Sequence, residues 1–494
     1  MKVLFYTVFM ATPHFETELE LIQDHLLKGD EVYILHCKGQ LSTCFLNPTH
    51  NLGYCVICQS KFKNGISLIN IERIKFIEIP TNENQYPQIP HVFKSINELK
   101  DFKIGNVDVG MAATSSLITS LNKEHRLNTL KHRKQVYKEV NTAYFVYSFF
   151  KENLAEIQPD LVYLFNGRFS TILPAINACE EMGIRYATHE RAGVNNKYYL
   201  AFNTTPHDLE SAHNEIGQLW ENTDENVRLE IGQKFFNDRR NRVEHAWFSF
   251  TKSQELGLLP KNFDAQKKNI ALFNSTIEEY AAIRNWKNPI PIYNEEIIAF
   301  NKIFESLNND SNIQIYFRVH PNLKGADNSQ MHDIKCLEGK FKNVTILFPE
   351  SNVDSYTLME NCDTIITFGS TMGVEACYWN KPSILLGMSY YDKLGCCYIP
   401  QSHEETIELI RTDLVPKPKT GALKYGFWEL SKGIHFKFFK QTGLASGYFL
   451  GKEVNFTSLS FIKAIFVYIL SIRSTYDIKQ LYKIAKKILF KNKN

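Results

Sequence analysis

Apolar and polar positions alternate along the chain with two periods, and their order predicts repeated units of strand, helix and strand. Residues 2–9 are mostly apolar or β-branched, as in a buried strand. Residues 12–28 carry apolar side chains at helical spacing, and Gly29 ends this pattern before a second apolar run begins at Glu31. The opening of the chain is therefore predicted to be a βαβ unit.

The same order returns through the rest of the sequence. A strand at residues 159–165 is followed by a helix at 172–182 and a strand at 184–190, and a further series begins at Lys268. Strands alternating with helices predict an α/β protein with parallel sheets. Because 494 residues exceed the usual size of one core, we expect two domains, at 1–260 and 261–455, and a separate tail at 456–494.

Two strand ends in the second half carry groups that suit an anion. Residues 313–321 form a buried-type strand that delivers Arg318 and His320 to its carboxyl end, where α/β sheets bind ligands. Residues 364–387 predict a strand, a tight loop, a short helix and a second strand. In that loop Gly369 permits a sharp turn, and Ser370 and Thr371 lie where a helix N-terminus offers N–H groups to a phosphate.

This ordered pair of motifs resembles the donor-binding half of GT-B glycosyltransferases that build bacterial capsules and related polymers. A strand ending in His320-Pro321, followed by a strand and the Ser370-Thr371 loop, is similar to the pairing in Kdo, polysialic acid and CDP-glycerol transferases. The resemblance is clearest over residues 265–400. It implies a GT-B fold, two Rossmann-like domains facing a cleft, in which His320 contacts the donor phosphate and Ser370 and Thr371 bind phosphate oxygens.

The resemblance also implies further donor contacts. Asn274, Ser275 and Thr276 occupy the first loop of the second βαβ series, which commonly faces the donor in GT-B enzymes. The same hydroxyls could instead cap the following helix, and both roles are compatible. Glu375 falls one turn into the helix after the Ser-Thr loop, where related enzymes use a carboxylate on ribose hydroxyls; the alternative is a local ion pair.

Candidate acceptor-side residues end two neighbouring strands of the first half. Asn166 and Arg168 follow one strand, and Glu190 ends the next. Transfer to a hydroxyl with inversion needs a base to take its proton, so we expect Glu190 to be that base, with His14 as second candidate. An ion pair between Glu190 and a nearby arginine is the structural alternative, and the sequence does not decide the stereochemistry.

Four of the ten cysteines lie close together in residues 36–60. Cys55 and Cys58 have the spacing of a metal clip, and Cys37 and Cys44 precede them in turn-rich sequence. One interpretation is a structural zinc site or iron–sulfur cluster. The other is a set of reduced cytosolic thiols, because the first gaps are not those of a standard zinc ribbon.

Composition and charge narrow the function. The net charge of +3 gives no reason to expect nucleic acid as a partner. The chain contains no Asp-x-Asp motif, which disfavours the metal-dependent GT-A class, so no cofactor is expected for catalysis. Residues 461–470 are apolar but too short to span a bilayer, and lysines follow, so the tail predicts a basic amphipathic helix on an anionic membrane surface. Its alternative is a helix packed on the first domain.

These observations predict a glycosyltransferase that moves a sugar from a nucleotide-sugar donor to a growing capsule or lipopolysaccharide glycan. We expect a cytidine-activated sugar as the donor, and a UDP-sugar is the alternative. The N-terminal strand has no signal-peptide pattern, so we expect a cytoplasmic protein at the inner face of the cytoplasmic membrane, acting on a lipid-linked or oligosaccharide acceptor. A UDP-sugar 2-epimerase and a non-catalytic scaffold of a capsule assembly complex remain as alternatives.

Overall fold

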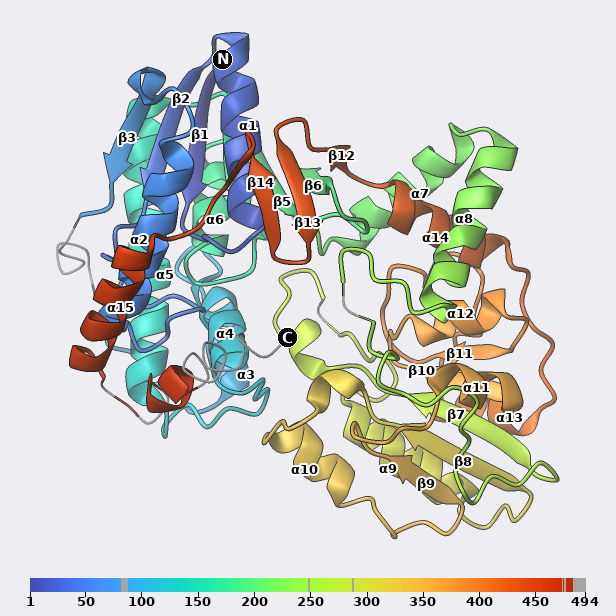
Figure 1. The fold of residues 1–494 in the computed structure, drawn as a ribbon. Coiled ribbons are helices and arrows are strands. Elements are labelled where there is room, and N and C mark those ends of the chain that lie inside the picture. Colours follow the sequence, from blue (N-terminus) through green and yellow to red (C-terminus); the bar gives the residue numbers. More distant parts are fainter. Residues whose placement is uncertain (81–87, 248, 287, 473, 475–476, 483–494) are drawn as a thin grey trace.

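The computed structural model describes residues 1–80, 88–247, 249–286, 288–472, 474 and 477–482. Two α/β domains lie side by side, each built around its own sheet (Figure 1). The predicted fold class, two Rossmann-like domains, is confirmed.

The first sheet has seven strands in the order β12-β6-β5-β4-β1-β2-β3. The five strands from β5 to β3 in this order run parallel to one another, whereas β6 and β12 are antiparallel to their neighbours. The strands are β1 Lys2–Thr7, β2 Glu31–His36, β3 Ile74–Glu78, β4 Leu161–Phe165, β5 Tyr186–Arg191, β6 Lys197–Phe202 and β12 Ile434–His435. The helices of this half are α1 His14–Lys28, α2 Leu52–Ile66, α3 Ile96–Lys100, α4 Val109–Ser120, α5 Arg133–Ile157 and α6 Leu173–Glu181.

The second sheet has five strands, all parallel, in the order β11-β10-β7-β8-β9. Its strands are β7 Lys268–Phe273, β8 Ile313–Arg318, β9 Val344–Leu347, β10 Thr364–Thr367 and β11 Ser383–Leu385. The helices between and after them are α9 Glu296–Leu307, α10 Ser329–Lys335, α11 Ser355–Asn361, α12 Met372–Tyr378, α13 His403–Arg411 and α14 Thr420–Ser431. Short 3-10 turns follow β7 at Ile277–Glu279 and β8 at Pro321–Leu323.

The predicted boundary at residue 260 is wrong, because the chain enters the second domain earlier. Helices α7 (Leu209–Glu221) and α8 (Glu225–Arg240) pack against α14. Ile216 and Phe236 share a hydrophobic cluster with Val374 of α12 and Trp428 of α14. The apolar faces of α7 and α8 thus complete the second domain, although both helices precede β7 in sequence.

The predicted end of the second domain at residue 455 is also wrong, because the chain returns to the first domain. Strand β12 pairs with β6, and a small sheet follows, made of β13 Phe439–Gly443, β14 Ser446–Phe449 and β15 Lys452–Glu453. Glu20 of α1 accepts the backbone N–H groups of Lys437, Phe438 and Phe439 at 2.6, 2.9 and 3.0 Å. A buried carboxylate with three donors is well satisfied, so Glu20 fixes this returning segment to α1.

Helix α15 (Ser458–Leu470) follows this small sheet and packs against α2 of the first domain. The lysines of the predicted basic tail from 483 onward lie outside the described residues. In the part of the chain that the structure describes, no helix is long and apolar enough to cross a membrane.

Candidate active site

Glu190 stands at the carboxyl end of β5 with three groups around its carboxylate. Asn166 donates from Nδ2 to Oε2 at 2.7 Å, and the backbone N–H of Arg191 donates to Oε1 at 2.9 Å. Nε2 of His14 lies 3.4 Å from Oε1. The Glu190 side chain keeps 16% of its surface exposed. The structure thus brings together Glu190, His14 and Asn166, which the sequence places far apart.

The His14 ring is buried beside Glu190 and packs edge-on against Phe165, with ring centroids 4.6 Å apart. Burial, and next the positive charge of nearby His189, Arg191 and Lys61, holds the pKa of His14 well below its usual value. The ring is therefore neutral at neutral pH. His14 is therefore an uncharged neighbour that can orient the Glu190 side chain.

Arg168 does not pair with Glu190, which was one structural alternative for that carboxylate. Its Nε donates to the hydroxyl of Ser115 at 3.3 Å, and its Nη2 donates to the carbonyl oxygen of Glu278 at 3.1 Å. Glu278 lies in the turn after β7 of the second sheet. Arg168 therefore ties the loop after β4 to the second domain, and the carboxylates of Glu190 and Glu278 both lie within electrostatic range of its guanidinium.

His320 follows β8 and is held in one tautomer. The backbone N–H of Asn322 donates to its Nδ1 at 3.1 Å, and the hydroxyl of Thr276 lies 3.3 Å from the same atom. Burial, followed by the positive charges of Lys123 and Arg318, lowers the pKa of His320 to about 4. At neutral pH the ring is uncharged and carries its hydrogen on Nε2, which suits donation to a phosphate oxygen.

Arg318 is the last residue of β8 and only 2% exposed. Its Nη1 donates to the carbonyl of Phe348 at 3.2 Å, while within the described residues Nε has no hydrogen-bond partner. Burial lowers the pKa of Arg318 to about 10, with Glu350 opposing the shift. The guanidinium remains charged at neutral pH, and a buried cation that lacks a close carboxylate favours an anion at this strand end.

The loop after β10 is shaped by Gly369, whose φ is 107°. A Cβ added there would lie 2.8 Å from the carbonyl oxygen of Met388, so only glycine fits this close approach. Nη2 of Arg239 donates to the hydroxyl of Thr371 at 2.9 Å, and the hydroxyl of Ser370 lies 3.4 Å from the N–H of Met372. Both predicted hydroxyls therefore lie in the loop that the sequence indicated.

Glu375 forms a local ion pair, which was the alternative to a ribose contact. Its side chain is fully buried, Nε of Arg239 donates to Oε1 at 2.8 Å, and the hydroxyl of Tyr356 donates to Oε2 at 2.5 Å. Both carboxylate oxygens are therefore occupied. Its predicted contact with a ribose gains no support from this arrangement.

The loop after β7 contacts the loops that follow β8 and β10 through three residues, Asn274, Ser275 and Thr276. Oδ1 of Asn274 accepts the backbone N–H of His320 at 2.8 Å, and the hydroxyl of Ser275 donates to the carbonyl of Phe368 at 3.2 Å. The three residues are buried, and within the described residues the side chain of Thr276 forms no capping hydrogen bond with the turn that follows it. Their visible role is to fix the β8 and β10 loops relative to β7.

Sequence reasoning missed three side chains of this site. Nζ of Lys123, from the loop after α4, lies 3.1 Å from Oε1 of Glu278. Glu279 contacts Asn322 at 3.4 Å, and burial followed by the charge of Glu278 raises its pKa to about 7. Lys123 falls in a stretch whose pattern predicted no function, and the two glutamates resembled helix-start carboxylates, so only the folded chain reveals their position.

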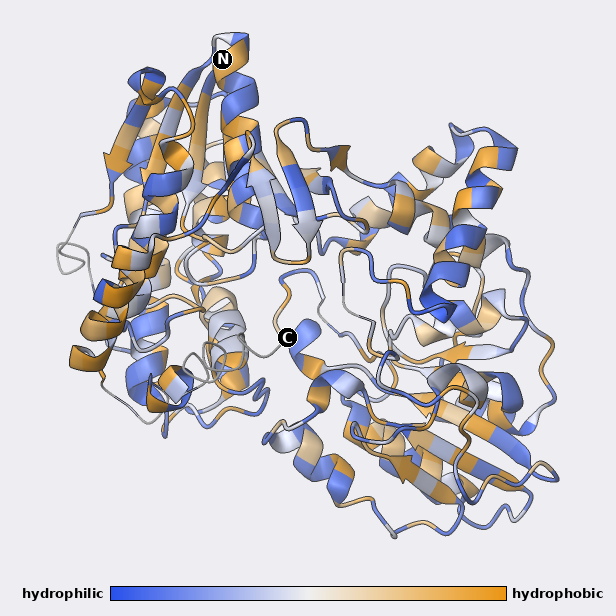
Figure 2. Cartoon of the chain, viewed as in Figure 1, coloured by the Kyte–Doolittle hydropathy of each residue, from blue (hydrophilic) through white to orange (hydrophobic). Residues whose placement is uncertain are grey.

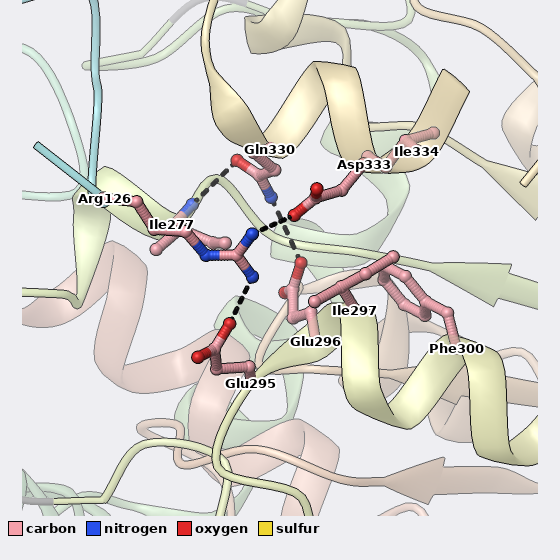
Figure 3. A pocket seen from close by; sticks show the side chains of 9 residues that line it. All are labelled: Arg126, Ile277, Glu295, Glu296, Ile297, Phe300, Gln330, Asp333 and Ile334. Carbon is pink, nitrogen blue, oxygen red and sulfur yellow. Dashed lines mark hydrogen bonds and ion pairs between the residues drawn. The ribbon is translucent and has the colours of Figure 1, made fainter. Parts of the chain in front are cut away.

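A small cavity lies beside a set of ion pairs, here called the clasp, that connects the two domains. Arg126 of the first domain reaches across and forms ion pairs with Glu295 and, at 2.6 Å, with Asp333 (Figure 3). The cavity beneath it has a volume of about 10 Å³. This is far below the several hundred Å³ of typical ligand pockets, so the clasp is not the nucleotide site.

The four clustered cysteines come together at the start of α2 without forming a metal centre. Asn47 donates from Nδ2 to the sulfur of Cys55 at 3.6 Å, and burial raises the pKa of Cys55 to about 11. Burial also raises the pKa values of Cys44 and Cys58, so both side chains are thiols at neutral pH in the metal-free chain. Among the described residues, no three His, Cys, Asp or Glu side chains are placed to hold a metal ion. The residues present, Cys37 included, do not fit the predicted zinc or iron–sulfur site.

A model of the capsule polysaccharide biosynthesis protein family matches residues 251–413. The match spans β7 to α13 and includes the loops with Asn274, His320 and Ser370. The resemblance to capsule polysaccharide biosynthesis proteins is confirmed for this segment. Glu190, His14, Asn166 and Arg168 lie outside it. Comparison with curated protein sequences returned no match.

Solved structures with a related arrangement include KpsC of Thermosulfurimonas dismutans, a beta Kdo 2,4 transferase. It is 13% identical, the match covers 62% of this chain and 87% of that one, and the TM-score is 0.38. The UDP-GlcNAc 2-epimerase of Neisseria meningitidis bound to UDP-GlcNAc is also 13% identical. The match covers 86% of this chain and 97% of the epimerase chain, and the TM-score is 0.29. At these scores the likeness carries no argument about function, and the fold assignment comes from the two sheets themselves.

Proposed function

We propose that this chain is a GT-B glycosyltransferase that moves a sugar from a nucleotide-sugar donor to a growing capsule or lipopolysaccharide glycan. The observation that carries the proposal is a direct contact between the loops that follow two strand ends, one in each domain. Glu190 ends β5 on one side, and Arg318 and His320 end β8 on the other. The bond from Arg168 to the carbonyl of Glu278 joins the loops between them.

In this proposal Glu190 takes the proton from the acceptor hydroxyl as that oxygen attacks the sugar. Asn166 fixes the carboxylate at 2.7 Å, and neutral His14 lies on its other oxygen. The leaving nucleotide develops negative charge on its phosphate, and the guanidinium of Arg318 and the Nε2–H of His320 stabilise it. These groups supply the charge that a divalent ion supplies in metal-dependent transferases, so we propose a metal-independent reaction.

We propose a CMP-sugar as the first donor to test and a UDP-sugar as the second. The acceptor is a lipid-linked glycan or an oligosaccharide. The setting is the cytoplasm, with the protein held at the inner face of the cytoplasmic membrane. Support for a nucleotide donor comes from the family match over the donor half and from the anion-favouring groups at the end of β8.

The test is an acceptor-dependent turnover assay on the purified full chain. CMP- and UDP-sugars are incubated with and without a capsule oligosaccharide, and released nucleotide and acceptor mass are measured together. We expect nucleotide release that depends on the acceptor, with an acceptor mass increase of one sugar unit. Release of an epimerised free sugar without acceptor would instead identify a 2-epimerase, and no turnover of any donor would favour a scaffold.

A further inference from the structure

Helix α15 is held against the first domain by one narrow face. Ala464 and Tyr468, one turn apart, are buried against α2. A Cβ added at Gly53 of α2 would lie 2.5 Å from Cβ of Tyr468 and 2.6 Å from the carbonyl oxygen of Ala464. The two helices therefore approach so closely that only glycine fits at this position. Asn51 adds a hydrogen bond from Nδ2 to the carbonyl of Tyr468 at 3.2 Å.

Asp477, which follows α15 in the sequence, is fixed as well. Thr49 donates its hydroxyl to Oδ1 of Asp477 at 2.6 Å, and the hydroxyl of Tyr468 donates to the backbone carbonyl of Asp477 at 2.9 Å. Asp477 is 1% exposed. The orientation of α15 on the domain is thus set by contacts at Ala464, Tyr468 and Asp477.

The face of α15 opposite Ala464 and Tyr468 is apolar and open to solvent. At 100° per residue the exposed side chains fall within one sector of the helix, and Lys463 lies at its edge. Figure 2 shows this helix as an apolar element on the outside of the first domain. The exposed fractions are 78% for Leu459, 66% for Ile462, 65% for Phe466, 52% for Ile469 and 71% for Leu470. A surface helix normally presents polar residues here, so a continuous apolar stripe indicates a partner.

The net positive charge of the C-terminal sequence selects the partner. From residue 461 to the end, the sequence carries eight basic residues and one acidic residue, Asp477, which is buried and already bonded to Thr49. Lys463 and Lys479 are exposed. An apolar stripe flanked by cations complements a surface that is apolar inside and anionic outside, which is the chemistry of an anionic lipid bilayer.

We propose that the face formed by Leu459, Ile462, Phe466, Ile469 and Leu470, here called the α15 stripe, docks on an anionic membrane surface. The helix has 13 residues, about 20 Å at the usual rise, so it suits a position in the plane of the interface rather than across a hydrocarbon core of about 30 Å. This inference rests on the membrane setting of the proposed function but not on the transfer reaction.

The test is co-sedimentation of the full chain with vesicles of phosphatidylcholine alone or mixed with phosphatidylglycerol. We expect binding to the mixed vesicles, weakened by salt because charge contributes. The triple variant Ile462→Ser, Phe466→Ser, Leu470→Ser should reduce the partition coefficient at least about 10-fold, since each change removes apolar surface from the bilayer contact.

A matched control carries three similar changes on exposed residues elsewhere, Leu27→Ser, Leu256→Ser and Val415→Ser, whose exposed fractions are 66%, 75% and 72%. It should bind vesicles like the unchanged chain. Equal binding by the α15 variant, or no binding by the unchanged chain, would overturn the inference. So would a chain that is dimeric without vesicles and monomeric in the α15 variant, because a second copy would then cover the stripe. Vesicle binding without any nucleotide binding would leave this inference standing and refute the proposed function.

Discussion

The end of β5 in the first domain and the end of β8 in the second domain differ in the charge that they present to a ligand. On the first side, Glu190 is partly exposed, and the groups on its oxygens are an amide, a backbone N–H and a neutral imidazole. On the second side, Arg318 is a buried cation that forms no ion pair within the described residues, and the buried carboxylate of Glu375 is paired with Arg239.

This difference assigns a separate task to each side. A carboxylate without a salt-bridge partner can accept a proton, and a cation without a carboxylate can receive a phosphate. Pairing Glu190 with a cation would weaken proton transfer, and pairing Arg318 with a carboxylate would weaken phosphate binding. Changing single charged groups on each side tests this difference.

The largest effect is expected from Glu190→Gln on the first side. The amide keeps the shape and can still accept a hydrogen bond from Asn166, but it cannot take a proton. Sugar transfer should fall by about 10²- to 10⁴-fold while nucleotide affinity stays unchanged. Steady-state turnover and calorimetric nucleotide titration measure the two quantities. The control is Glu210→Gln, an exposed glutamate of α7. Full transfer activity in Glu190→Gln would refute the base assignment.

On the second side, Arg239→Ala should lower the free energy of unfolding by about 3 kcal/mol, because it leaves the buried carboxylate of Glu375 without its cation. The neighbouring variant Arg240→Ala breaks an ion pair with Glu360 in which both side chains are 35% exposed, so it should cost less than about 1 kcal/mol. Denaturant unfolding measures both. Similar losses of unfolding free energy in the two variants would show that the burial of Glu375 does not add to the stability that its ion pair provides.

The smallest effect concerns pH and Glu279. Its pKa of about 7 lies above the ordinary value, so the group is neutral below that pH and anionic above it. The negative charge would repel a donor phosphate near His320, so nucleotide affinity should fall several-fold as pH rises from about 6 to about 8. In Glu279→Gln this part of the pH dependence should disappear.

Titration of the nucleotide itself is common to both proteins and cancels in the comparison. Glu338→Gln, an exposed change after α10, should keep the pH profile of the unchanged chain. Without nucleotide, the stability that the Glu279 proton contributes is complete below pH about 4.5 and is lost as pH rises through about 7. Identical profiles for Glu279→Gln and the unchanged chain would remove Glu279 from the site.

The local elements and the strand-end groups could be predicted from the sequence because they depend on nearby residues. Gly29 ends α1 with a φ of 84°, as expected of a helix stop. The alternation of strands and helices was sufficient to place His320 and Ser370 at the carboxyl ends of two strands of the same sheet, β8 and β10. Glu190 and Asn166 came from the same rule applied to the first sheet.

Other features depend on partners far away in the sequence. The apolar face of α8 shows that the helix packs on something, but not that its partner is α14, which follows nearly 200 residues later in the sequence. The ion pair between Arg239 and Glu375 joins residues 136 positions apart, and the bonds from residues 437–439 to Glu20 span more than 400. A pattern within one segment identifies a face to be buried but not its partner, and for this reason the domain boundaries were wrong.

The most direct test of the cleft is a thermal-shift titration with CMP, CDP, UMP, UDP and GDP. It compares the unchanged chain with His320→Ala and with His332→Ala, an exposed histidine of α10 as control. We predict stabilisation by one class of nucleotide, kept in His332→Ala and lost in His320→Ala. Stabilisation by none of the five, or equal stabilisation of the His320→Ala variant, would contradict a donor site at the end of β8.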